Sequence, residues 1–301
     1  MSDIRQTSEW AKYLSQIGWK VQKLGKNYLY IKKVSLIGTY IKIPRSSWPI
    51  DLEKVDMLAH QNHTLMIKIT PKIESDSAKA SSVHTRLIKH GFFKEYWTLT
   101  VSKTMIVDLT KTEDELFKSF HKNTRFDINF AKRNGVKIIQ SDDINTSYKL
   151  YLQTAGRNKF TPQSLKEAKT RFLTFKKSGK AILFFALSED DEYLATLLIL
   201  LNPTESGVFC SLAGTSNVHR NLRASHLLYW EAMILTKKLG YKKFDFDGIL
   251  DPRYPQTKNW AGFTFFKRGF GGKEVTYIGS YLKWYNPILR FLFKLLTKIT
   301  N

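Results

Sequence analysis

Short stretches of alternating or helically spaced apolar residues follow one another through the first hundred positions. Ser8 precedes a helical pattern that stops at Gly18, so we expect a capped helix between them. The other elements predicted here are, in chain order, a hairpin of "KVQKL" and "YLYIKK" around the turn "GKN", a strand "TYIKIP", a helix "LEKVDMLAHQN", a strand "TLMIKIT", a loop leading into a helix within "ESDSAKASSVHTRLIKHG", and a strand "WTLTVSKTMIVDL".

The pattern changes after Asp108. "TKTEDELFKSFHKNTRFDINFAKRNG" begins with a Thr cap signal and acidic residues and stops at Gly135, which predicts one long helix. The elements that follow are a strand "GVKIIQ", helices near 144–156 and 162–178, strands "AILFFAL", "YLATLLILL" and "SGVFCSLAG", a helix "RASHLLYWEAMILTKKLG" and a strand "KKFDFDG". A meander followed by strand, helix and strand is the order of the GNAT acyltransferase fold, so we expect a mixed α+β (α/β) protein.

The segment before the last long helix would, in that fold, supply amides to a phosphate-bearing donor. In acetyl-CoA users it reads Gln/Arg-x-x-Gly-x-Gly/Ala. Here "HRNLRASHLL" has Arg220 to open the motif, but Arg223 stands where the glycine belongs. A bulky side chain there argues against coenzyme A bound in the usual way, although an irregular loop would relocate the phosphate cradle.

Charge narrows the range of partners. Lys and Arg number 48 against 26 Asp and Glu, a formal net charge of +22. Such an excess attracts polyanions, which makes RNA, DNA, anionic lipid or phosphorylated substrates the expected partners. A basic proteome or a solubility device is the alternative, because net charge speaks to association and not to fold.

The number of cysteines and the surroundings of two histidines indicate neither disulfides nor a metal site. Cys210 stands alone, which excludes an intramolecular disulfide and fits a reducing cytoplasm, and its apolar strand indicates core packing. His219 and His226 have no ligand cluster around them and are interpreted as structural, so no metal and no cofactor are predicted. The N-terminus lacks a signal-peptide core and no apolar run reaches the roughly 20 residues of a spanning helix, which predicts a protein not integral to a membrane.

The last residues, 286–301, have the pattern of an interfacial helix. "NPILRFLFKLLTKITN" places Arg290, Lys294 and Lys298 four apart on one face, with apolar side chains around the rest. Contact with an anionic membrane is one interpretation. The other is a terminal helix that packs its apolar side onto the protein, and both can hold for different sides of the helix.

Several motifs together resemble a known family. "VDLTKTEDELFKSFHKNTRFDINFAKRNGV", "AGTSN…RASHLLYWEAM", "FDFDGI" and "FFKRGFGG", with "SEWAKYLSQIGWKV" at the front, are similar to the Fem family (FemABX) of peptidoglycan-branching aminoacyltransferases. The resemblance implies two GNAT-like domains, each a mostly antiparallel twisted sheet flanked by helices. The first would comprise 1–108 and return with 280–301 at the C-terminal helix, and the second would be 109–279.

The resemblance also gives the stretch "FTFFKRGFGGKEV" a chemical meaning. It implies that Lys267 faces the oxyanion that develops during aminolysis of an ester, and that Phe266 shapes the wall beside it. The glycines would let the backbone turn tightly beside the substrates. A Gly-bounded β-hairpin with an exposed cation pair is the alternative. Asp247 is the candidate base, with Asp245 two positions away on the same face, although Asp-Gly at a strand end is usually turn chemistry.

Substrate contacts follow from the resemblance and from charge. Arg157 resembles the arginine that the family uses for the acceptor diphosphate, and a surface arginine ending a helix is the alternative. Family members can place a basic contact where this chain has Leu14, and Lys12 is the nearest cation. The full substrate-binding set is Arg157, Arg268, Gly269, Phe270, Gly271, Lys12, Arg220 and Arg223. A stripe that would follow an RNA backbone comprises Lys122, Arg125, Lys132 and Arg133, with a solvated helix face as the alternative.

Three functions are consistent with these residues. The first is transfer of an amino acid from aminoacyl-tRNA to the stem-peptide amine of a UDP- or lipid-linked peptidoglycan precursor, forming an interpeptide bridge. It would take place in the cytoplasm or on the inner face of the plasma membrane and serve cell-wall biogenesis and cell shape. The second is a Fem-like N-acyltransferase that uses another acyl donor or amine in a polysaccharide or envelope pathway. The third is a non-catalytic nucleic-acid or membrane-binding protein, which the Lys267 motif argues against.

Overall fold

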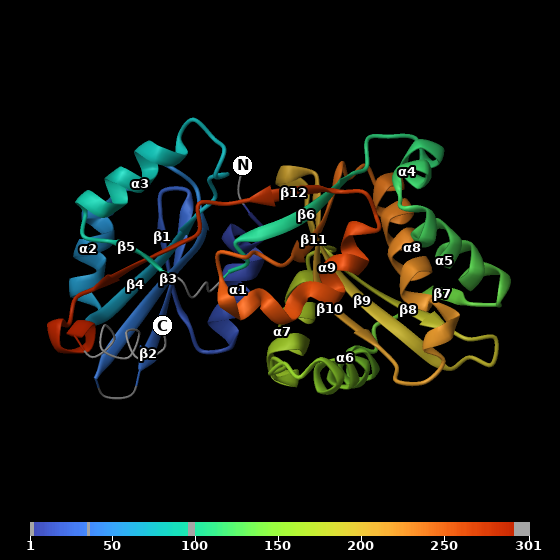
Figure 1. Ribbon diagram of the computed structural model, residues 1–301. Helices are drawn as coiled ribbons and strands as arrows, with labels where there is room; N and C mark the ends of the chain where they lie inside the picture. Colours follow the sequence, from blue (N-terminus) through green and yellow to red (C-terminus); the bar gives the residue numbers. More distant parts are fainter. Residues whose placement is uncertain (1–2, 35–36, 96–99, 292–301) are drawn as a thin grey trace. The chain divides into compact units, whose positions relative to one another are not determined.

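Two compact units make up the chain in the computed structural model, which describes residues 3–34, 37–95 and 100–291 (Figure 1). The first unit comprises residues 1–102, 253–256 and 276–301, and the second comprises residues 103–252 and 257–275. Each unit has its own sheet and its own cluster of buried apolar side chains.

The first unit is built on a six-stranded sheet with the order β1-β2-β3-β4-β13-β5. Strands β3 and β4 pair in parallel, and the other neighbours pair antiparallel. Its elements are the 3₁₀ turn η1 (Ile4–Gln6), α1 (Ser8–Gln16), β1 (Lys20–Leu24), β2 (Asn27–Val34), β3 (Gly38–Ser46), α2 (Leu52–Gln61), β4 (Thr64–Pro71), α3 (Ala80–Lys89), β5 (Phe93–Glu95) and β13 (Ser280–Trp284).

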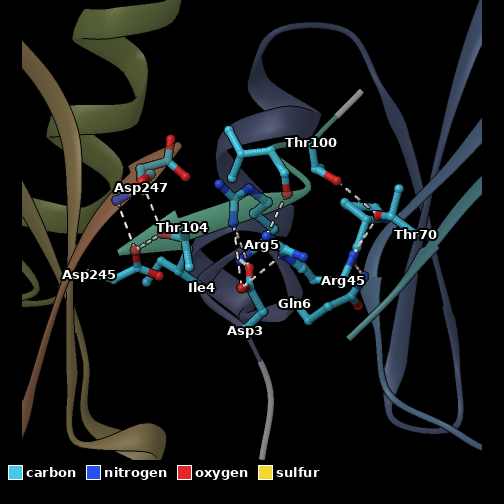
Figure 2. Close-up of polar contacts among 12 residues, drawn as sticks. Asp3, Ile4, Arg5, Gln6, Arg45, Thr70, Thr100, Thr104, Asp245 and Asp247 are labelled. Carbon is cyan, nitrogen blue, oxygen red and sulfur yellow. Dashed lines mark hydrogen bonds and ion pairs between the residues drawn. The ribbon is translucent and has the colours of Figure 1, made fainter. Parts of the chain in front are cut away.

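Buried charges accompany the apolar core of the first unit. Lys68 Nζ lies 2.5 Å from Glu95 Oε2, and both side chains are 7% exposed. Figure 2 shows a second group, in which the buried Asp3 carboxylate meets the guanidinium of Arg5 at 3.1 Å and that of Arg45 at 3.9 Å. Burial raises the pKa of Asp3, but these two cations outweigh it and hold the pKa below its usual value.

The second unit is built on a seven-stranded sheet with the order β12-β6-β11-β10-β9-β8-β7. Strands β10 and β11 pair in parallel, whereas β6–β11, β9–β10, β8–β9 and β7–β8 are antiparallel. Helices α6 and α7 lie on one side of this sheet and α5 and α8 on the other (Figure 1). The elements are β6 (Lys103–Asp108), α4 (Glu113–Ser119), α5 (Lys122–Arg133), β7 (Lys137–Gln140), α6 (Ile144–Asn158), α7 (Leu165–Lys176), β8 (Ala181–Leu187), β9 (Tyr193–Asn202), η2 (Pro203–Glu205), β10 (Gly207–Thr215), η3 (Arg220–Leu222), α8 (Ala224–Lys238), β11 (Lys243–Gly248), η4 (Pro255–Trp260), α9 (Ala261–Arg268) and β12 (Lys273–Thr276).

The predicted mixed class, with two sheets flanked by helices, is confirmed. The prediction of a single long helix after Asp108 is wrong. The chain forms two helices, α4 and α5, with an extended residue, Phe120, between them (φ −73°, ψ 151°). Each of the two helices has its own N-cap: Thr112 forms a capping box with Glu115, and the His121 side chain accepts from the Asn123 backbone N–H. Phe120 is 2% exposed and packs in the core, so burial of its ring accompanies the break.

Smaller differences concern the ends of elements. Helix α1 is capped by the Thr7 side chain, which accepts from Trp10 N, one residue before the predicted cap. The strand predicted as "WTLTVSKTMIVDL" begins only at Lys103, and residues 96–99 lie outside the described residues. Within the ranges that the structure describes, no helix combines the length and the apolar character needed to cross a bilayer.

Candidate active site

A cavity opens in the second unit where two neighbouring parallel strands part. Pairing of β10 with β11 joins Gly207–Phe209 to Lys243–Asp245 and then stops, although β10 continues to Thr215. The cavity beyond this point has a volume of about 620 Å³. It is lined by residues of β10, β11, α6, α8, α9 and the segment between β10 and α8. Strand divergence therefore creates the space, without any inserted domain.

Lys267 reaches this cavity from the last turn of α9. Its Nζ donates to the Gly248 carbonyl at 2.5 Å and lies 4.9 Å from the centre of the Phe263 ring. Burial lowers the pKa of Lys267, and the nearby Asp247 carboxylate opposes that shift. The side chain thus presents a positioned amine that two neighbouring groups hold in one place.

Phe270 anchors the end of α9. Its ring is fully buried, with its centre 5.3 Å from that of Phe120 and 5.1 Å from that of Phe246. Phe266 lies one turn earlier and lines the cavity, with its ring 5.3 Å from that of Tyr229. The aromatic residues of the motif therefore fix the helix that carries Lys267.

The glycines of the motif bring the same segment close to other protein backbone. A Cβ at Gly269 would collide with Thr124 Oγ1, and one at Gly271, which has φ +66°, would collide with the Ser119 carbonyl. The Gly269 carbonyl also accepts from His121 N at 2.8 Å. The structure places these glycines against α4 and α5 and not along the cavity, and the alternative of a β-hairpin is wrong because the motif is a helix followed by a turn.

Asp247 lines the cavity at the end of β11 in a left-handed conformation, with φ +60°. Figure 2 shows how this turn is held: Asp245 Oδ1 accepts from Asp247 N at 2.8 Å and contacts the hydroxyl of Thr104. Asp245 is not among the described residues that line the cavity. The expected shared face is thus absent at the cavity, because the strand register shifts between Asp245 and Gly248.

Two guanidinium groups lie at another part of the cavity wall. Arg157, on α6, donates to Asn217 Oδ1 at 2.5 Å and to Thr154 Oγ1 at 3.2 Å, and it also contacts the Thr215 hydroxyl. Burial and the positive charge of Arg220 lower the pKa of Arg157. Asn217, Thr154 and Thr215 are all neutral, so the charges of Arg157 and Arg220 suit an anionic ligand group.

The N-terminus of α8 completes the wall. Arg223 caps the helix in a left-handed conformation (φ +57°), and its Nε lies 3.6 Å from Asp127 Oδ1. His226 Nε2 lies 3.5 Å from the other Asp127 oxygen, and its ring centre is 4.9 Å from that of Phe266. Burial lowers the pKa of His226, with Asp127 opposing the shift. Arg223, at the position where the acetyl-CoA motif would have glycine, thus has a backbone conformation that favours glycine.

His226 and Cys210 were interpreted from sequence as structural, yet both line the cavity. Cys210 is 8% exposed and also belongs to the hydrophobic core, and burial raises the pKa of its thiol. The spacing of His226 one helical turn after Arg223 was the available signal. Among the described residues, no group of three His, Cys, Asp or Glu side chains is arranged to hold a metal ion.

The remaining predicted residues lie elsewhere. Arg268 forms an ion pair with Glu274 at 2.6 Å, and Lys12 is exposed on α1 of the first unit. On α5, Arg125 donates to the Lys118 and Phe120 carbonyls at 2.9 and 2.7 Å.

Lys132 lies 3.2 Å from Glu231. Lys122 and Arg133 are exposed, one at each end of α5. Two of the four predicted RNA-binding cations, Arg125 and Lys132, thus contact other groups of the protein, and the RNA-binding stripe stays a prediction.

Comparisons with known proteins agree with the architecture. Residues 176–298, which include the Lys267 motif, match the model of the FemAB family. The lipid II:glycine glycyltransferase of Staphylococcus aureus (strain COL) is 24% identical over 228 residues, which cover 66% of this chain and 54% of that protein. The chain thus spans about half the length of the curated relatives it matches.

Solved structures show the same fold over nearly the whole chain. FemX superposes with a TM-score of 0.81 at 19% identity, covering 96% of this chain and 94% of FemX. L-PGS from Bacillus licheniformis gives 0.61 at 15% identity (96% and 91% covered), and a tandem GNAT protein from the clavulanic acid biosynthesis pathway gives 0.57 at 10% (95% and 98%). Together with the match of residues 176–298, which is less than half of the chain, these superpositions show that the chain is similar to FemAB proteins and has a GNAT-like fold.

Proposed function

We propose that this protein is an aminoacyltransferase that moves an amino acid from aminoacyl-tRNA to the stem-peptide amine of a peptidoglycan precursor. The match of residues 176–298 to the FemAB family model and the glycyltransferase activity named for the relatives support the reaction class. The observation that carries the proposal is Lys267, an amine fixed inside the cavity between β10 and β11 by the Gly248 carbonyl.

Aminolysis of an aminoacyl ester is faster when a cation lies beside the reacting carbonyl oxygen. The neutral acceptor amine attacks the carbonyl carbon of the aminoacyl ester, and the carbonyl oxygen becomes an oxyanion. Protonated Lys267 stabilises that oxyanion by a charge-assisted hydrogen bond. Collapse of the intermediate re-forms the carbonyl, breaks the ester bond and releases the ribose oxygen of the tRNA, while the amide bond to the acceptor remains.

A proton must also move from the attacking amine to the departing ribose oxygen. Asp247 lines the same cavity, and its carboxyl group lies near enough to Lys267 to influence the pKa of that amine, so it suits the role of proton acceptor in this transfer. Its left-handed backbone, held by Asp245, fixes where the carboxylate can reach. We propose Asp247 as the base on these grounds.

The acceptor contributes negative charge through its diphosphate, and Arg157 with Arg220 provides the matching cations. Bidentate hydrogen bonding of guanidinium to phosphate gives both affinity and orientation. The relatives are named for lipid II, which favours the lipid-linked acceptor over the soluble nucleotide form. Work at a lipid-linked acceptor would occur on the inner face of the plasma membrane. Residues 287–291 are helical and expose Phe291, and residues 292–301 of the predicted interfacial helix lie outside the described residues.

Transfer of a labelled amino acid from a pool of charged tRNAs tests the proposal. Lipid-linked and UDP-linked pentapeptide are offered as acceptors, with and without ribonuclease, and acyl-CoA donors are run in parallel. We expect ribonuclease-sensitive transfer with the lipid-linked acceptor as the better substrate. Transfer from acyl-CoA that ribonuclease leaves unchanged, or no transfer by the folded protein, would contradict the proposal.

A further inference from the structure

Helix α5 exposes an aromatic and basic face that the protein itself does not cover. The face comprises Lys122, Phe126, Asn129, Phe130 and Arg133, which are spaced three or four positions apart and so lie along one side of the helix. Phe126 is 59% exposed, and its ring stacks on that of Phe130 with centres 6.0 Å apart. Phe126 and Phe130 thus form an aromatic pair within a face whose other members are polar or basic.

The charges of this face are available to a partner. Lys122 and Arg133 are exposed at its two ends, and neither forms an ion pair within the described part of the chain. The acid of the same helix, Asp127, is turned to Arg223 and His226. The charged side chains of the face are therefore all positive, which complements a polyanion.

The position of the face relates it to the cavity. Asp127 directly follows Phe126 in the chain, and its two partners, Arg223 and His226, both line the cavity. Further along, Lys132 pairs with Glu231 of α8, so α5 and α8 run side by side in the same direction. Along the helix axis, the N-terminal end of the face thus lies toward the cavity end of α8, on the side of α5 opposite the buried Thr124, Ile128 and Ala131.

We propose that this face of α5 binds single-stranded RNA, with an unpaired base stacked on Phe126 and phosphates neutralised by Lys122 and Arg133. Aromatic rings flanked by cations are how proteins hold single strands without reading their sequence. The inference rests on the proposed function, in which the donor is an RNA whose acylated end must enter the cavity.

A membrane is the less suitable occupant. Interfacial helices bury a wide apolar face in the lipid headgroup region. Here two phenyl rings are flanked by the exposed polar side chains of Asn123, Asn129 and Asn134, which would remain in the interface. Asn129 can instead hydrogen-bond to a base or a ribose.

Fluorescence anisotropy with two RNA hairpins tests the inference: one carries a single-stranded 3′ tail and the other lacks it. We expect the tailed hairpin to bind more tightly and Phe126→Ala to lower its affinity about tenfold, in keeping with the loss of one stacked base. Phe126→Tyr keeps the ring and should retain the affinity. Thermal unfolding checks that each variant is folded.

Charge is tested with a matched pair on the same helix. Arg133→Ala and Lys132→Ala remove one positive charge each, but only Arg133 belongs to the face. Arg133→Ala should weaken binding and lower the salt dependence by about one counterion, whereas Lys132→Ala should come close to wild type. Equal losses from both variants, or wild-type affinity in Phe126→Ala, would overturn the inference.

The outcomes separate this inference from the proposed function. Lys267→Ala should lower the transfer rate about 10²- to 10³-fold and keep tail-dependent RNA binding. Ribonuclease-sensitive transfer with unchanged RNA binding by Phe126→Ala would leave the function standing and refute the RNA surface. If Phe126→Ala instead lost binding to phosphatidylglycerol vesicles and kept binding to RNA, the face would be a membrane contact and the inference would be wrong.

Discussion

Substitution of Gly269 by alanine tests how the catalytic segment is held. Gly269 has φ −55° and ψ −24°, a helical conformation that alanine adopts without strain. Any effect must therefore come from space. A Cβ there would collide with Thr124 Oγ1, and its next neighbours would be the Phe266 carbonyl oxygen at 3.1 Å and Thr124 Cβ at 3.5 Å.

The magnitude follows from this single collision. Inserting one methyl group into a packed site costs about 1–3 kcal/mol of unfolding free energy. Relief of the collision would shift the end of α9, which carries Lys267, away from α5. A displacement of about 1 Å at the reacting centre can lower the rate on the order of 10²-fold. Gly269→Ala should therefore lose both stability and transfer activity.

A double-mutant cycle isolates the cause. Thr124→Ala removes Oγ1 and leaves the other two distances, both of which a small adjustment can accommodate. The double variant should regain about 1 kcal/mol or more of unfolding free energy relative to Gly269→Ala, together with much of its activity. Denaturant unfolding and initial transfer rates measure both. Wild-type behaviour of Gly269→Ala, or no recovery in the double variant, would refute the close-approach explanation.

Three further predictions concern charges. Glu95→Gln leaves Lys68 buried without its carboxylate, which should cost about 3–5 kcal/mol in denaturant unfolding, whereas an apolar replacement of both residues should cost much less. His226 has a lowered pKa, so the unfolded state binds its proton first, and stability should fall as the pH drops below about 6.5. His226→Gln should flatten thermal midpoints across that range, and an unchanged slope would contradict the assignment. Arg157→Ala should raise KM for the acceptor about tenfold or more with little change in kcat, which steady-state kinetics at varied acceptor would measure.

Periodicity was sufficient for most of the fold and insufficient for its breaks. The hairpin of β1 and β2 and the strands β8 to β10 follow from local apolar patterns and turn residues. The break at Phe120 does not, because it depends on contacts with residues about 150 positions later, where His121 N meets the Gly269 carbonyl. An apolar pattern depends only on residues that are close in sequence, and it therefore predicts one helix where the protein forms α4 and α5.

The site shows the same division. Lys267 was predicted through the resemblance of its motif to that of a family; the structure places it at the cavity, and its catalytic role stays a prediction. The cavity itself arises from the divergence of β10 and β11 beyond Phe209, which leaves no mark in the apolar pattern of either strand. For that reason the sequence predicted a structural role for His226 and core packing for Cys210, and did not place either residue at a cavity.

The rate of transfer by Lys267→Ala is the most direct test of the central claim. The assay is single-turnover transfer from aminoacyl-tRNA to lipid-linked pentapeptide, and Lys166→Ala, which removes an exposed lysine of α7, is the control. If Lys267 stabilises the oxyanion, Lys267→Ala should lower the rate about 10²- to 10³-fold, and Lys166→Ala should leave it unchanged. A folded Lys267→Ala protein that transfers at the wild-type rate would contradict the account.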